Sequence, residues 1–155
     1  MKSNKLENTI SLSKKQFEAL MKVVYLGNWM ANAYRTEDMK KDYEGIEDFI
    51  FSLAPSFGLD QYMDHEETDG NRYYPTRSFE EDTDVHVMHE AYDEESMWDK
   101  LADGLGERDF FEKYTQEEIK HMSRGERFAK LTECILIYEI EFEKYGLRRI
   151  RIQKK

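Results

Sequence analysis

Two histidines and four carboxylates form the cluster best suited to metal chemistry in this sequence: Asp82, Asp84, His86, His89, Glu90 and Asp93. On a helix, Asp82, His86, His89 and Asp93 would share one face, because steps of three and four residues return to the same side. Imidazole and carboxylate groups are ligands of Zn²⁺, Mn²⁺ and Fe²⁺. No HExxH motif accompanies them, and an acidic segment supplies such neighbours by composition. We therefore predict no metal ligands and keep a metal-binding protein or metal-dependent enzyme, using His86, His89 and nearby acids, as an alternative.

No other arrangement carries stronger catalytic chemistry. Glu118 and His121 have the Glu-x-x-His spacing of di-iron carboxylate bundles, but such a site needs two pairs and the chain has one. Cys134 lies in an apolar helical stretch, so we expect a buried, neutral thiol. The Gly-x-Ser-x-Gly and GxxxxGK[ST] motifs are absent. We predict no catalytic residues, no cofactor and no cofactor-binding residues, which favours a protein that is not an enzyme.

Two further groups of residues have a structural and a functional interpretation. Asn28 and Asn32 lie one helical turn apart in a strongly apolar segment, with Arg35 close behind. They form either an internal polar network that sets helix register or the polar floor of a small-molecule pocket. The segment 72–79, Arg-Tyr-Tyr-Pro-Thr-Arg-Ser-Phe, is rich in the residue types that dominate protein interfaces. It either covers the open end of a helical bundle or forms a partner-binding patch.

The charge of the chain is concentrated in its middle. The net charge is −10, and residues 60–95 alone hold 13 acids against 2 bases. Such a segment repels the phosphate backbone, so we expect no direct nucleic acid binding. An acidic nucleic-acid mimic, which would occupy a basic site on another protein, remains a further alternative.

Cysteine content and hydropathy indicate the compartment. Cys134 is the single cysteine, so no internal disulfide can form. The first fifteen residues lack the apolar core of a signal peptide. The most apolar run, residues 19–34, is shorter than the ~20 residues that cross a bilayer. We expect a cytoplasmic protein without a membrane association.

Periodicity and capping signals predict an all-α protein, a single domain over residues 1–155 with residues 1–11 flexible. We expect a bundle of five to six helices with a small β-hairpin around residues 61–76, where Asp69-Gly70 indicates a turn, and a short strand-like tail. The first and last long helices should pack together at the centre, with Gly27 permitting close approach. The residues predicted to be buried there are Trp29, Phe128, Leu131 and Ile135. The tail, residues 147–152, should dock near the acidic middle. A second helix should begin at Thr36 and end at Pro55, and the other predicted helices cover residues 13–34, 83–91, 94–114, 116–122 and 124–145.

These features favour a small, acidic, helical protein that is not an enzyme and acts as a protein–protein interaction module. Its partner would be another protein or a second copy of itself.

Overall fold

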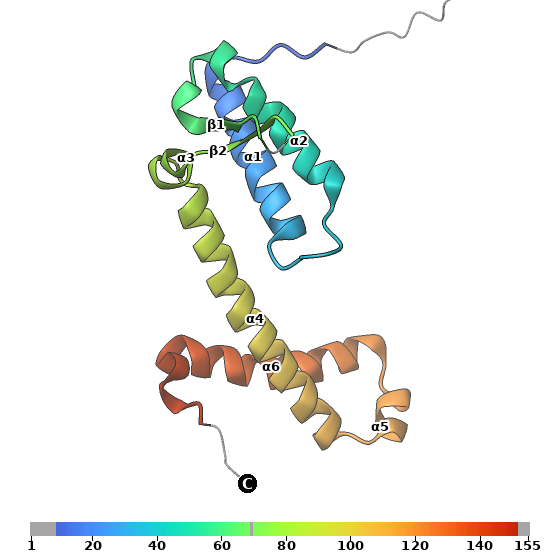
Figure 1. Cartoon of the computed structure of the whole chain (residues 1–155). Helices are drawn as coiled ribbons and strands as arrows, with labels where there is room; N and C mark the ends of the chain where they lie inside the picture. Colours follow the sequence, from blue (N-terminus) through green and yellow to red (C-terminus); the bar gives the residue numbers. More distant parts are fainter. Residues whose placement is uncertain (1–8, 69, 152–155) are drawn as a thin grey trace, which may run out of the picture. The chain divides into compact units, whose positions relative to one another are not determined.

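The computed structural model describes residues 9–68 and 70–151, and the chain divides into two compact units. Unit 1 covers Met1–His89 and unit 2 covers Glu90–Lys155. Helix makes up 74% of the structure, and the described residues contain six α-helices and one two-stranded antiparallel hairpin (Figure 1). The prediction of a mainly α fold with a small β-hairpin is therefore confirmed. No helix in the described part of the chain has the length and apolar character that crossing a membrane requires.

Unit 1 is built on two helices and the hairpin, with α1 and α2 packed together (Figure 1). Helix α1 (Lys14–Asn32) begins at a capping box, in which the Ser13 hydroxyl accepts from the Gln16 N–H and the Gln16 side chain accepts from the Ser13 N–H. Helix α2 (Lys41–Ser52) runs into two short 3-10 helices, Ala54–Phe57 and Asp60–Tyr62. Strands β1 (Met63–Glu66) and β2 (Arg72–Pro75) follow, and then α3 (Arg77–Asp82).

Aromatic side chains dominate the core of unit 1. Phe79 is fully buried, and its ring meets those of Tyr25, Phe51 and Tyr62 edge-on at centroid distances of 5.1–5.7 Å. Edge-to-face contacts of this kind add to the free energy of burial. The side chain of Phe79 therefore joins α1, α2 and the approach to the hairpin. The buried core residues are Phe17, Met21, Ile50, Phe51, Ala54, Leu59, Phe79 and Val85.

Unit 2 contains most of the long helix α4 (Val85–Lys113), followed by α5 (Gln116–His121), α6 (Arg124–Tyr145) and a 3-10 turn, Gly146–Arg149. Helices α4 and α6 cross (Figure 1), and Gly106 lies at the crossing. A Cβ added at Gly106 would lie 2.6 Å from the Ile135 Cα atom, so only glycine allows this approach. The small buried cluster beside the crossing contains Phe110, Ile119 and Cys134.

Several details of the sequence interpretation were wrong. The second helix was predicted to begin at Thr36, but α2 begins at Lys41. The predicted central core is replaced by two core clusters, one in each unit, because α1 and α6 belong to different units. Trp29, Leu131 and Ile135 are half-buried, and Phe128 is 71% exposed. The predicted helices 83–91 and 94–114 are one helix, since the residues around Asp93 permit helix as well as a cap. An added Cβ at Gly27 meets no atom within 4 Å, so Gly27 permits no close approach.

The predicted strand-like tail is a further correction. Gly146 has a positive φ of 53°, which ends α6, and the chain then forms the 3-10 turn Gly146–Arg149. Arg149 lies over the Tyr145 ring and pairs with Glu141 of α6 at 3.1 Å. The local ion pair and ring contact hold Arg149 against α6, and the described sheet contains only β1 and β2. Ile152 and the predicted flexible residues 1–8 lie outside the described residues. The single domain over residues 1–155 stays a prediction.

Candidate functional site

The histidines of the metal hypothesis lie on the first turns of α4, in unit 1. The His89 ring is half-buried and contacts the Trp29 ring at a centroid distance of 3.8 Å, and it is 6.4 Å from the His86 ring. Both line a shallow cavity of ≈360 Å³ together with Tyr25, Arg77, Glu80 and Glu81. Within the described residues, no three side chains of His, Cys, Asp or Glu are placed to share a metal ion. The geometry places His89 against the aromatic side chain of α1, where it contributes to packing.

Most of the described contacts of the segment 72–79 are with other residues of unit 1. Arg72 donates to Glu44 of α2 at 2.5 Å, and the Tyr73 ring stacks on His65 of the neighbouring strand at 4.4 Å. Phe79 is fully buried, whereas Tyr74 is 39% exposed. These contacts favour the structural interpretation, in which the segment closes one side of the unit.

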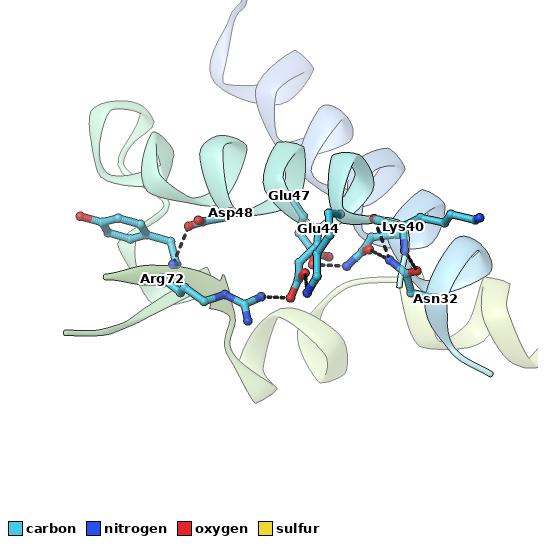
Figure 2. A network of polar contacts seen from close by, with 9 residues as sticks. Asn32, Lys40, Glu44, Glu47, Asp48 and Arg72 are labelled. Atoms are coloured by element: carbon cyan, nitrogen blue, oxygen red, sulfur yellow. Dashed lines mark hydrogen bonds and ion pairs between the residues drawn. The ribbon is translucent and has the colours of Figure 1, made fainter. Parts of the chain in front are cut away.

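A polar network joins the end of α1 to α2 (Figure 2). Asn32 is 6% exposed; its amide donates to the Asn28 side chain at 2.7 Å, and its oxygen accepts from the Lys40 N–H at 2.7 Å. Asn28 in turn donates to the Glu47 carboxylate at 2.5 Å. Both amides are therefore satisfied by protein groups, as buried amides must be to avoid a penalty of roughly 1–3 kcal/mol. This arrangement favours the internal network over the floor of a pocket.

The network continues through three acids of α2 to the hairpin (Figure 2). Glu44 accepts from Arg72 of β2, and Asp48 accepts from the Tyr73 N–H at 2.7 Å. The hydrogen bond from Lys41, together with the charge of Arg72, lowers the pKa of Glu44. Burial raises the pKa of Glu47 to about 7, and the hydrogen bond from Asn28 offsets only part of that rise. The two carboxyls thus have pKa shifts of opposite sign, because the cations Lys41 and Arg72 dominate at Glu44 and partial burial dominates at Glu47.

Helix α6 of unit 2 carries one of the exposed apolar surfaces of the described residues. Four large apolar side chains are exposed there: Phe128 by 71%, Leu136 by 47%, Ile137 by 65% and Ile140 by 55%. At 3.6 residues per turn, the four side chains spread over about half of the circumference of α6: Leu136 and Ile140 lie opposite to the buried Cys134 and Phe142, and Phe128 and Ile137 lie at the two borders. We call these four residues the α6 apolar face. Sequence reasoning placed Phe128 in the core and left Leu136, Ile137 and Ile140 unassigned. A signal was nevertheless present, because α6 is apolar on more than one side.

A groove of ≈720 Å³ lies between α4 and α6 within unit 2. Trp98 and Phe142 line it, with ring centroids 5.4 Å apart. Five acids also line it, from the two helices: Glu94, Glu95, Asp99, Glu139 and Glu143. Leu147 and Arg148 of the tail belong to the same lining, so part of the tail does approach the end of the acidic segment.

Comparison of the chain with protein-family models, curated protein sequences and solved structures finds no match. The functional interpretation therefore depends on the geometry of this chain.

Proposed function

We propose that this protein is a non-enzymatic protein–protein interaction module whose contact surface is the α6 apolar face. The observation that carries the proposal is the exposure of Phe128, Leu136, Ile137 and Ile140 on the half of α6 that is centred on Leu136 and Ile140. At roughly 150–200 Å² for a large side chain, these fractions leave on the order of 400 Å² of apolar surface in water. The largest apolar patch on a typical monomer measures roughly 300–600 Å² and often has a binding function.

The free energy gained by burying the α6 apolar face is of the size that binding requires. Burial of on the order of 400 Å² contributes roughly 10 kcal/mol at about 25 cal/mol/Å². Association costs roughly 4–15 kcal/mol in lost translational and rotational freedom, so polar contacts at the rim must contribute as well. Charged residues of α6 surround the face and are placed to supply such contacts.

Several finer features belong to the same proposal. The lone Cys134 fits a reducing cytoplasmic location, and the net charge of −10 argues against direct binding to nucleic acid. An acidic mimic of nucleic acid would bind its partner mainly through charge. A surface centred on four exposed apolar side chains favours a hydrophobic contact with a protein instead.

The test uses a photo-cross-linking amino acid placed at Ile137, with Val23 of α1 as the matched control position. The two side chains are 65% and 66% exposed, so general accessibility cannot explain a difference between them. We expect a discrete protein adduct from position 137, none from position 23, and loss of the adduct in an Ile140→Glu background. The captured protein, once identified and purified, should bind the purified chain, and Phe128→Glu should weaken that binding by at least tenfold. Equal labelling from both positions, or capture that Ile140→Glu leaves intact, would contradict the proposal.

A further inference from the structure

The exposed half of α6 is acidic as well as apolar. Three glutamates lie on it, Glu133, Glu139 and Glu143, because steps of three and seven residues from Leu136 return to the same side of a helix. All three are exposed, and among the described residues none of their carboxylates has an ion pair or a hydrogen-bond partner. The half of α6 centred on Leu136 and Ile140 therefore combines apolar contact area with negative charge that the protein leaves unpaired.

The bases of α6 do not neutralise this surface. Three of its four bases lie toward the buried side of the helix: Arg124, Arg127 and Lys130. Lys130 pairs with Glu126 at 2.8 Å, and Glu126 lies at the border of the exposed half. The fourth base, Lys144, also lies at the border, with its Nζ atom 5.1 Å from the centre of the Tyr145 ring. The centre of the α6 apolar face is thus flanked by acids alone.

The acidic surface continues into the groove between α4 and α6. Glu139 and Glu143 line the groove, together with three acids of α4: Glu94, Glu95 and Asp99. The bases in the same lining are Lys144 and Arg148, so acids outnumber bases by five to two. The half-buried Trp98 adds an aromatic surface. Carboxylates beside an aromatic ring favour a lysine or arginine side chain, through charge pairing and a cation–π contact.

We propose that the partner segment recognised by the α6 apolar face is a basic amphipathic helix; this inference rests on the proposed function. The apolar side of that helix covers Leu136 and Ile140. Its lysine or arginine side chains meet Glu139 and Glu143, and one of them enters the groove beside Trp98. An acidic partner segment would bring like charges together at this surface, which costs free energy.

The dimensions of the surface fit a helical partner. From Phe128 to Glu143 it extends about 23 Å along α6, at a rise of about 1.5 Å per residue. A partner helix of about four turns covers this length and presents apolar anchors at spacings of three and four residues. The groove has a volume of ≈720 Å³, which leaves room for a basic side chain.

The first experiment measures the binding of two synthetic peptides to the purified full-length chain by fluorescence anisotropy at low salt. Each peptide has about 18 residues, more than the roughly 12–15 that an isolated helix needs. Leucines stand at helical spacing in both, and the other positions are lysine in one and glutamate in the other. We expect the leucine–lysine peptide to bind roughly tenfold or more tightly than the leucine–glutamate peptide. Equal binding of the two, or no binding of the leucine–lysine peptide up to about 200 µM, overturns the inference.

The second experiment reverses the charge of the surface. Glu139→Lys combined with Glu143→Lys should weaken the leucine–lysine peptide by roughly tenfold or more, and should strengthen binding of the leucine–glutamate peptide. Asp103→Lys combined with Glu107→Lys is the matched control, because these acids are also exposed, are also four residues apart and do not line the groove. The control should change either affinity by no more than about twofold. Equal losses in the two double variants overturn the inference, because they show an effect of net charge alone.

A third comparison tests the apolar contact. Ile140→Gln should weaken the leucine–lysine peptide by roughly tenfold, because it removes an apolar side chain from the centre of the face without changing its charge. Val23→Gln, on α1, should leave the affinity unchanged. Binding that Ile140→Gln does not alter overturns the inference, since the peptide would then be held by charge away from the apolar face. Circular dichroism confirms that every variant keeps its helix content.

The two proposals fail in different ways. If the peptide comparisons fail while position 137 cross-links to a protein through a segment without basic residues, a basic helix is the wrong partner and the interaction module stands. If neither peptide binds and position 137 yields no adduct, both are refuted.

Discussion

Glu47→Gln should stabilise unit 1 at alkaline pH and leave its stability at acidic pH almost unchanged. Glu47 lies on α2, where Asn28 of α1 donates a hydrogen bond to its carboxylate. Burial raises the pKa of this carboxyl to about 7, from an ordinary value of 4.5. Glutamine has the shape of the protonated acid and retains an oxygen that accepts from Asn28. The substitution therefore removes the titration and keeps the contact.

The direction of this pH dependence follows from the number of protons that the folded and unfolded states bind. A carboxyl whose pKa is higher in the folded state than in the unfolded state binds more protons when folded, so stability falls as the pH rises from about 4.5 to about 7. Each pKa unit corresponds to about 1.4 kcal/mol, which sets a ceiling of roughly 3 kcal/mol. Glu47 is only half-buried, and solvent screening reduces this figure to about 1–2 kcal/mol.

The assay is urea unfolding followed by tryptophan fluorescence at pH 4.5, 6 and 8. Trp29 lies in unit 1 and Trp98 in unit 2, so a Trp98→Phe background reports on unit 1 alone. In this background, Glu47→Gln should match the parent at pH 4.5 and exceed its free energy of unfolding by about 1–2 kcal/mol at pH 8. The rise should be half complete at about pH 6, midway between the unfolded and the folded pKa, and should level off above about pH 7.

Glu44→Gln is the matched control in the same network. Because Lys41 and Arg72 lower the pKa of Glu44, its charged form stabilises the fold, and that stability is lost as the pH falls through the folded pKa. This variant should be less stable than the parent at pH 8 and approach it at acidic pH. A stability difference for Glu47→Gln that does not change between pH 4.5 and 8 would refute the reasoning.

Three further predictions concern packing. Gly106→Ala should destabilise unit 2 by about 1–3 kcal/mol or more, because the added Cβ meets the backbone of α6. Gly27→Ala should raise the free energy of unfolding of unit 1 by up to about 1 kcal/mol, because its Cβ meets no other atom. Urea unfolding of single-tryptophan variants measures both changes. Phe79→Ala should cost unit 1 about 3–5 kcal/mol, and the exposed Phe49→Ala should cost far less in the same assay. Cys134 is 6% exposed, so a thiol reagent should label it slowly until urea unfolds unit 2; rapid stoichiometric labelling of the native chain would contradict its placement.

Local signals in the sequence were enough to define most of the secondary structure. The capping boxes at Ser13 and Thr115 begin α1 and α5 as expected, because the two residues of each box satisfy each other's backbone N–H groups. The predicted hairpin around residues 61–76 is found over residues 63–75, with Gly70 at a positive φ between its strands. Each of these features depends on residues within a few positions of one another.

Only the tertiary structure decided which side of each apolar helix is covered. Helix α6 carries apolar residues on two sides, and spacing alone does not say which side meets α4. The choice follows from Gly106, since a helix can approach α4 closely only where a Cβ is missing, and this places Ile135 at the crossing and leaves Ile137 in water.

The polar residues also show the difference between what local sequence predicts and what the tertiary structure decides. Spacing placed Asn28 and Asn32 on one helical face, but their partners Glu47 and Lys40 come from a later part of the chain. The shift of the Glu47 pKa likewise depends on burial against α1, which no local pattern records. Sequence determines elements through short-range hydrogen bonding and side-chain spacing, whereas burial and charge environment depend on contacts that exist only once the chain has folded.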